Sequence, residues 1–451
     1  MSTLTIAPFR GVRYNPEKVW DLTAVVAPPY DVISAEGQLR YYARHEYNVI
    51  RLILGQELPG DDERLNRYTR AGEFFRRWLE EGILVQDPVP CLYLSEERFV
   101  HPRDGKERRR RGVIPIVRLS PYEEGRVFPH ERTFSKPKRD RLLLMRACQA
   151  NLDPVFACYP STLEPVEQTF EEAMGEEAFI DLTDDDGVRH QLWRLSDPVK
   201  IRQVARAFKE ERVFIADGHH RYETALAFRD ELSAADPAPP QVKATRSYNY
   251  VMMTLVSSHD PDLVILPTHR LLRTLPFPSS DPFLEAVGRF FDIQARPLRE
   301  EGEIGKVIGE MERLGEKRRI IGMYDGEDCY LLILKDERLL AGIGGRPEGS
   351  QWTDVTLLHH LLIEGILGLD KASLEEGEIA YTRDGAEAIR LVQQGAYRLA
   401  FFLNPTKISE VQVATLVGER LPPKSTFFYP KLLSGLVFHR LDPNEPVEPP
   451  L

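Results

Sequence analysis

Short apolar runs alternate with amphipathic segments along the chain, and this pattern predicts a protein built from both strands and helices. The runs at 154–159, 249–257 and 400–403 are apolar and too short for most helices, which indicates buried strands. Apolar residues recur at helical spacing in 64–81 and 283–291. The mixed order predicts an α/β fold with α+β character.

The connections between these elements add three predictions. Runs at 90–99 and 112–119 predict a hairpin, and the Arg- and Lys-rich link 101–111 predicts a solvated loop. Asp325-Gly326 predicts a second hairpin between 318–324 and 329–335. The β-branched and leucine-rich segment 48–54 predicts a strand.

The length of 451 residues favours two domains. We expect a first, phosphate-binding domain over 1–275 and a second, α+β domain over 276–451. The C-terminal segment 427–436 is too apolar for a loose end, and we expect it to pack back on the first domain.

The stretch from 212 to 232 combines a strand, a glycine turn and a helix. An apolar run ends at Ala216, Asp217-Gly218-His219-His220-Arg221 follows, and helical spacing then runs to Leu232. Such a turn presents backbone N–H groups and the positive end of a helix dipole, which together attract anions. His220 and Arg221 add donors. The alternative is that Asp217 caps the helix and the histidines are ordinary groups.

Asp217 is unexpected at an anion site, because a carboxylate repels phosphate unless it holds a cation or accepts a proton. We therefore predict that Asp217 is a catalytic group or a metal ligand, with His219 as a second catalytic candidate.

A second basic stretch runs from 128 to 141. Lys136, Lys138 and Arg141 are predicted to bind a polyphosphate, and Arg132 adds a fourth cation. His130 and Glu131 suit acid/base chemistry or metal binding. The alternative is a solvated charged face, followed by a helix over 142–150.

Three further segments supply candidate catalytic or phosphate-binding residues. Tyr30 and Asp31 follow Pro28-Pro29, a rigid turn that holds side chains in place, although a purely structural turn is the alternative. His269 and Arg270 follow another strand and turn. The segment 418–426 has the Gly-to-Lys-Ser spacing of a Walker loop, but Pro422 and Pro423 remove phosphate-binding donors. We therefore predict only cationic and hydroxyl ligands there, from Lys424, Ser425 and Thr426 and from the nearby Lys431.

Composition narrows the class of protein. With 59 Lys and Arg against 70 Asp and Glu, the net charge of −11 disfavours a general nucleic-acid binder. Cys91, Cys148, Cys158 and Cys329 lack paired spacing, so we expect buried thiols. With no apolar leader and no membrane span, we expect a cytoplasmic protein with no membrane partner.

Several of these segments together resemble one family across nearly the whole chain. The segments 28–31, 129–138, 217–222, 267–270 and 423–426 are similar to those of the prokaryotic domain of unknown function 1015. The turn at Asp217 also resembles that of the ParB/sulfiredoxin superfamily, whose members bind nucleotide phosphates at a glycine turn opening a helix. That superfamily includes sulfiredoxins, ParB-type CTPases and a free-serine kinase.

The resemblance implies a ParB/sulfiredoxin-like nucleotide-binding core. Individual residues of this chain then favour or disfavour each kind of protein in that superfamily. Sulfiredoxin chemistry needs a cysteine where His219 stands. The acidic balance disfavours a DNA-binding ParB protein. The kinase branch keeps Asp217, which implies a nucleotide-dependent small-molecule kinase that uses ATP or ADP with Mg²⁺ and acts on an amino acid such as serine.

Two alternatives stay open. One is a phosphatase or nucleotide hydrolase, and the other is a non-catalytic nucleotide-binding sensor or regulator. The expected partners are a nucleotide and a small-molecule substrate, and a homo-oligomer is not decided by the sequence.

Overall fold

The computed structural model describes residues 3–277, 279–298, 301–340, 343, 346–369 and 377–450. The chain forms two compact units. Unit 1 comprises Met1–Pro129, Thr133–Val264 and Pro430–Leu451, and unit 2 comprises His130–Arg132 and Ile265–Tyr429. Unit 2 therefore includes residues 265–275, which we expected in the first domain.

Unit 1 is built on one large mixed sheet. Its described strands run in the order β10-β11-β4-β5-β13-β9-β12-β7, with β1 and β6 joined at β13. Most neighbours are antiparallel, but β13 and β9 are parallel, as are β12 and β7. The strands are β1 Ile6–Ala7, β4 Leu92–Val100, β5 Glu107–Ile114, β6 Ile116–Arg118, β7 Val127–Pro129, β9 Val155–Tyr159, β10 Ile180–Thr183, β11 Arg189–Leu195, β12 Val213–Asp217 and β13 Tyr250–Ser257.

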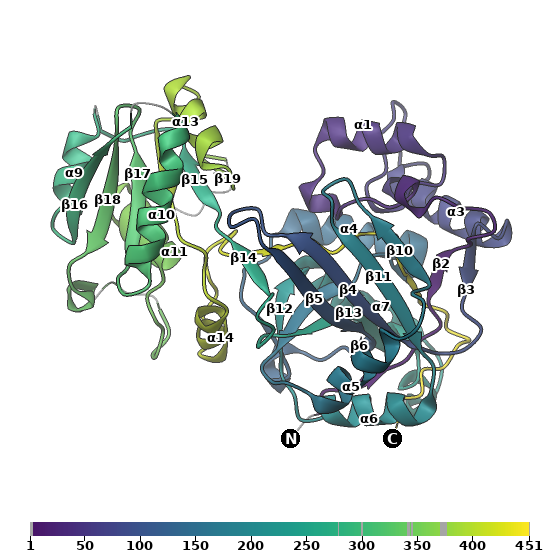
Figure 1. The fold of residues 1–451 in the computed structure, drawn as a ribbon. Helices are drawn as coiled ribbons and strands as arrows, with labels where there is room; N and C mark the ends of the chain where they lie inside the picture. The colour runs from purple at the N-terminus through teal and green to yellow at the C-terminus, as the bar shows by residue number, and fades with distance from the viewer. Residues whose placement is uncertain are drawn as a thin grey trace. The chain divides into compact units, whose positions relative to one another are not determined.

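Helices and short strands surround this sheet (Figure 1). Helix α4 packs against both α3 and α7, and this arrangement brings the basic stretch of the sequence beside the helix that follows Gly218. The helices of unit 1 are α1 Ala35–Arg44, α2 Ile50–Ile53, α3 Arg67–Glu80, α4 Ser135–Cys148, α5 Glu164–Ala173, α6 Pro198–Phe208, α7 His219–Ala235 and α8 Pro240–Lys243, and the short strands are β2 Val12–Tyr14, β3 Leu84–Gln86, β8 Ala150–Asn151 and β22 His439–Arg440.

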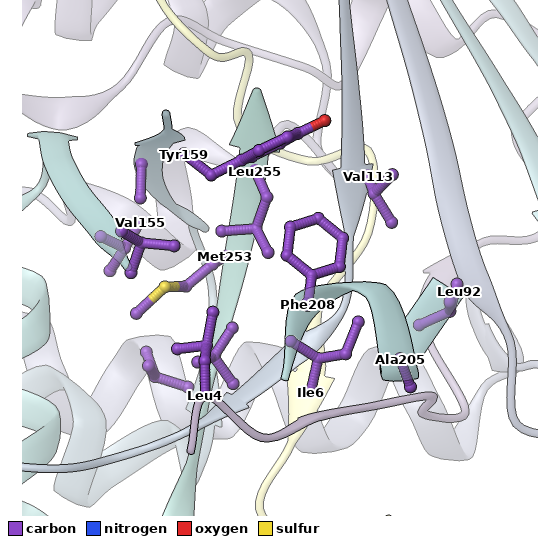
Figure 2. Close-up of a cluster of buried hydrophobic side chains, with 14 of the residues drawn as sticks. Leu4, Ile6, Leu92, Val113, Val155, Tyr159, Ala205, Phe208, Met253 and Leu255 are labelled. Atoms are coloured by element: carbon purple, nitrogen blue, oxygen red, sulfur yellow. The ribbon is translucent and has the colours of Figure 1, made fainter. Parts of the chain in front are cut away.

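The main core of unit 1 lies between the sheet and the helices. Figure 2 shows its side chains from the first strands, from α6 and from the central strands. Phe208 of α6 is fully buried and meets Tyr159 edge to face at a centroid distance of 4.9 Å. Burial of this kind fixes the central strands and therefore the position at which β12 ends.

The chain from Pro430 onward belongs to unit 1 and contributes to its cores. Phe438 exchanges backbone hydrogen bonds with Val12, and Ser434 does the same with Ala27. Phe438, Leu441 and Val447 are each buried in a different apolar cluster. The last residues of the chain are therefore part of the fold of unit 1.

Unit 2 contains an antiparallel sheet with helices. The described strands run in the order β16-β18-β17-β20-β15-β19. They are β15 His269–Leu272, β16 Phe291–Pro297, β17 Ile320–Tyr324, β18 Asp328–Leu334, β19 Ile379–Thr382 and β20 Leu399–Phe402, with β14 Val264–Leu266 crossing the unit boundary and β21 Phe427–Tyr429 near its end. The helices are α9 Asp281–Val287, α10 Ile304–Gly315, α11 Asp354–Thr356, a π-helix Leu357–Ile366, α13 Gly385–Gln393 and α14 Ile408–Leu416.

These elements confirm the mixed α/β fold and most of the predicted strands. The strand predicted over 48–54 is wrong, since Ile50–Ile53 form the short helix α2. The side chain of the buried Asn48 accepts a hydrogen bond from the Ile50 N–H (2.9 Å) and starts a turn in place of a strand.

The solvated loop predicted over 101–111 is also wrong in its second half, because β5 begins at Glu107. Arg110 lies opposite Glu97 and Arg111 opposite Glu96. Arg110 is fully buried, pairs with Glu97 (3.2 Å) and lies over the Phe156 ring (4.8 Å). The charge run is therefore a strand whose charges are paired across the sheet.

The helix predicted to begin at Leu142 begins earlier, at Ser135. Pro137 lies in its first turn, where a missing N–H removes no intrahelical bond. Lys136, Lys138 and Arg141 are therefore all on α4, with the spacing of a helix.

Candidate functional site

The strand–turn–helix unit predicted around Gly218 is present in unit 1. Strand β12 ends at Asp217, and α7 begins at His219. Gly218 has φ +90° and ψ 29°, and its carbonyl accepts the first helical hydrogen bond from the Tyr222 N–H (3.0 Å). A Cβ on Gly218 would lie 2.8 Å from Arg221 Nε. Glycine is therefore required here by both conformation and space.

Helix α7 is 17 residues long, and its N-cap residue has no side chain that accepts a hydrogen bond from the first turn. The first N–H groups of a helix have no partner within the helix, and the helix dipole makes this end positive. The turn at Gly218 therefore has the local geometry of a phosphate site.

Arg221 folds back over this turn. The residue is 9% exposed, and its guanidinium donates to the Pro154 carbonyl and lies 3.1 Å from Asp217. Burial alone lowers the pKa of Arg221, but the surrounding carboxylates, led by Asp217 and Asp153, outweigh burial and leave the pKa raised. Arg221 thus stabilises the turn and brings positive charge to the helix N-terminus.

Asp217 lies between two cations. One carboxylate oxygen pairs with Arg221, and the other lies 3.4 Å from Lys431 Nζ, a residue of the C-terminal segment. Within the described residues, no three His, Cys, Asp or Glu side chains gather as metal ligands. Asp217 thus has a cation near each of its carboxylate oxygens, and its role as a metal ligand stays a prediction.

Tyr30, from the Pro-Pro turn, packs on Arg141, and Arg141 lines a hollow together with Arg221. Burial raises the pKa of Tyr30 to about 12; the charge of Arg141 opposes this rise, and the charges of Asp31, Arg221 and Asp217 also act on the phenol. The Arg141 guanidinium lies 3.8 Å from the Tyr30 ring centroid. Asp31 itself is exposed. The structure thus brings two distant sequence segments together at one turn.

The basic stretch meets α7 through Glu223. This carboxylate accepts a hydrogen bond from Thr133 (2.6 Å) and pairs with Lys138 (3.0 Å). His220 Nε2 accepts a hydrogen bond from the Phe134 N–H (3.0 Å). A ring nitrogen that accepts carries no hydrogen, so the proton of neutral His220 is on Nδ1. His219 is buried at the start of α7.

The remaining cations of this stretch differ in their exposure. Lys136 is exposed on the first turn of α4. Arg141 is buried; it pairs with Asp140 (2.6 Å) and donates to the Ile53 carbonyl (2.9 Å). Through these contacts Arg141 holds α4 against Ile53 and against the Tyr30 ring.

The other predicted site residues form a second cluster, inside unit 2. His130 is fully buried, and its Nε2 lies 2.9 Å from the Thr426 hydroxyl. Glu131 accepts a hydrogen bond from the Lys424 N–H (3.2 Å), and Lys424 has φ +57°. The Ser425 carbonyl accepts from Thr406 (2.8 Å). Arg132 is exposed.

Arg270 also belongs to this second cluster and contacts the turn at Lys424. Its guanidinium donates to the carbonyls of Pro423 (3.1 Å) and Lys424 (3.0 Å), while Nε has no described partner. Burial lowers the pKa of Arg270 to about 10, against the opposing charges of Tyr381 and Glu131. The neighbouring His269 Nδ1 accepts from the Leu403 N–H (3.3 Å). These contacts stabilise the fold of unit 2.

Glu223 and Asp153 belong to the unit 1 cluster and were not among the predicted site residues, whereas Lys431 was predicted only as a cation of the segment that contains Lys424. Glu223 has no local pattern that marks it, because it looks like any charged residue on a helix. Lys431 follows an aromatic segment and carries only a weak cationic signal. Their roles depend on contacts between segments that are distant in the sequence.

The structure shows a mixed α/β protein in which a glycine turn joins a strand to the N-terminus of a helix in unit 1. The chain belongs to the family described as Protein of unknown function (DUF1015), whose model matches residues 6–358. This confirms the family predicted from the sequence. No curated protein matches the chain.

Solved structures with some likeness include a free serine kinase in complex with AMP, at 14% identity and a TM-score of 0.34, covering 70% of this chain and 86% of that chain. A conserved hypothetical protein from Pyrococcus furiosus has 11% identity and a TM-score of 0.34, covering 72% and 94%. SbnI with C-terminal truncation from Staphylococcus aureus has 12% identity and a TM-score of 0.33, covering 72% and 86%.

Likeness at these TM-scores does not establish a shared fold, so the ParB/sulfiredoxin resemblance stays a prediction. Within the described part of the chain, none of the helices has the length and apolar character needed to cross a bilayer. All four cysteines are buried and free, as expected.

Proposed function

We propose that this protein is a nucleotide-dependent small-molecule kinase, which transfers the terminal phosphoryl group of ATP or ADP to the hydroxyl of a small acceptor, an amino acid such as serine. The observation that supports this most is the turn at Gly218. It opens a 17-residue helix without a side-chain cap, and Arg221 and Lys431 stand beside it. Phosphoryl transfer needs positioned positive charge of this kind more than covalent chemistry from the protein.

The proposed reaction joins the acceptor oxygen to the terminal phosphorus. The bond between that phosphorus and the bridging oxygen breaks, and the bridging oxygen leaves with the electron pair on the nucleotide product. The hydroxyl proton passes to a carboxylate. Backbone N–H groups at the start of α7, together with Arg221 and Lys431, stabilise the charge on the phosphates.

Asp31 is the carboxylate that we propose as the base. It is exposed beside Tyr30, and it forms no ion pair within the described residues. Asp217 instead pairs with Arg221 and Lys431, so we propose that it positions those two cations. Because the described residues of this cluster form no metal site of their own, no step is assigned to Mg²⁺.

The test is incubation with ATP or ADP and pooled metabolites, followed by mass spectrometry of the products. The proposal predicts a phosphorylated acceptor. Asp31→Asn should lower turnover by roughly 10²-fold or more while leaving nucleotide affinity near that of the wild type. Asp230→Asn, on the exposed side of α7, is the matched control and should retain activity.

Three other results would contradict the proposal. Release of free phosphate alone would indicate a hydrolase, and nucleotide binding without turnover would indicate a sensor. Full activity of Asp31→Asn would exclude this carboxylate as the base.

A further inference from the structure

An open groove lies on the N-terminal part of unit 1. Its volume is about 630 Å³. Leu39 and Leu58 line it and are 59% and 47% exposed. Ligand sites commonly have such an apolar lining with a few polar groups, and this groove has enough room for a ligand larger than a single amino acid.

The polar groups of the groove include two amides and a neutral ion pair. Gln38 Nε2 donates to the Leu54 carbonyl (2.8 Å), which leaves its Oε1 as an acceptor. The side chain of Gln56 makes no hydrogen bond within the described residues. Glu57 and Arg67 pair with each other (3.1 Å). Amides can bind both donors and acceptors on a heterocyclic base, and the paired charges give the groove little net attraction for phosphate.

The groove is connected to the turn at Gly218 by the chain itself. Tyr30 packs on Arg141, which lines one hollow together with Arg221, and Ser34, four residues after Tyr30, lines the groove. Four residues span at most about 14 Å, which is a fully extended chain. Tyr30 and Ser34 therefore lie within the length of one elongated ligand.

Two smaller hollows, of about 10 and 40 Å³, lie among residues between the groove and Arg221. The first shares Gly55 and Arg67 with the groove and extends to Arg141. The second shares Arg141 and Leu144 with the first, and Arg221 lines it. Cavity-lining residues thus continue from the groove to the arginine that packs on Gly218.

We propose that this groove binds the base and ribose of the nucleotide whose phosphates bind at the Gly218 turn. The inference rests on the proposed function. It adds that affinity for the nucleotide has two separable parts, with phosphate affinity located at the turn and nucleoside affinity located between Leu39 and Leu58.

The experiment compares ADP with inorganic pyrophosphate by isothermal titration calorimetry. Pyrophosphate needs only the turn, whereas ADP also fills the groove. The double variant Leu39→Asn/Leu58→Asn removes apolar contact from the groove without adding charge. Leu65→Asn is the matched control, because Leu65 is 60% exposed and lies outside the groove lining.

We expect the double variant to bind ADP about tenfold more weakly and pyrophosphate as the wild type does, since lost apolar contact acts only on the nucleoside. Leu65→Asn should bind both as the wild type does. Thermal unfolding of each variant establishes that it is folded; all three positions are exposed, so little loss of stability is expected.

The failures of the two proposals are distinguishable. If the wild type binds ADP and pyrophosphate and the double variant binds ADP equally well, the groove proposal is overturned while the proposed function stands. Equal affinity of the wild type for ADP and pyrophosphate also overturns the groove proposal. If the wild type binds neither, both proposals fail.

Discussion

Substituting Gly218 by alanine isolates the interaction that shapes the proposed phosphate site. Alanine at φ +90° is strained by about 1 kcal/mol. Its Cβ would also lie 2.8 Å from Arg221 Nε and 2.9 Å from Cζ, so the guanidinium has to move. Moving it weakens the bonds to Asp217 and to the Pro154 carbonyl, and charged hydrogen bonds contribute about 1.5 to 3 kcal/mol each.

Gly60→Ala is a matched control. Gly60 has φ +91°, nearly the same as Gly218, but its Cβ would meet no atom within 4 Å. This variant therefore carries the backbone strain without the displaced arginine. We expect Gly60→Ala to lower the free energy of unfolding by about 1 kcal/mol and Gly218→Ala by about 3 to 4 kcal/mol.

Urea denaturation followed by tryptophan fluorescence measures this difference in a Trp352→Phe background. The remaining tryptophans, Trp20, Trp78 and Trp193, all belong to unit 1. The midpoint should fall further for Gly218→Ala than for Gly60→Ala, at an unchanged slope. Equal midpoints for the two variants would refute the account of Arg221 packed against this turn.

Three further predictions concern other parts of the molecule. Burial raises the pKa of Asp354 to about 7, while the charge of Arg319 opposes this rise. Asp354 therefore ionises in the unfolded chain before it does in the folded protein, and the free energy of unfolding should fall by about 4 kcal/mol as the pH rises from 4 to 7. Asp354→Asn should abolish this pH dependence in denaturation curves, and a dependence unchanged from the wild type would contradict the prediction. Arg270→Lys should destabilise unit 2 by about 1 to 3 kcal/mol in thermal unfolding, because one ammonium cannot replace the forked contacts to Pro423 and Lys424, whereas the exposed Arg273→Lys should have little effect. The four thiols should react with a disulfide reagent only after unfolding, since burial raises the pKa of each and covers it; rapid reaction of the native protein would contradict this.

The strands were the most predictable part of the fold. The runs that became β9, β13 and β20 are buried along their whole length, which produces the continuous apolar pattern seen in the sequence. The hairpin between β17 and β18 followed from Asp325-Gly326, and Gly326 has φ +103°. Local patterns of this kind need no knowledge of the rest of the chain.

The misassigned segments depend on contacts between distant residues. Charges at Arg110 and Arg111 indicate solvent when only their neighbours in sequence are considered, but Glu96 and Glu97 pair with them from the adjacent strand. The helix at Ile50–Ile53 follows a turn at Asn48, whose side chain also donates to the distant Ala24 and Val26 carbonyls. A propensity is a weak guide where tertiary packing decides the conformation.

The candidate site was predictable in part. The turn at Gly218 is a local pattern, and the structure contains it as predicted. The contact of Tyr30 with Arg141 and the pairing of Glu223 with Lys138 follow only from the way α4 packs against α7 and against the residues around Tyr30. Such long-range contacts leave no spacing pattern in a single sequence.

The most direct test of the central claim is a crystal structure of the protein with ADP. The account predicts phosphate oxygens within hydrogen-bonding distance of the backbone N–H groups of Gly218 to Arg221, with Lys431 and Asp31 beside them. ADP bound elsewhere, with nothing at the start of α7, would contradict it.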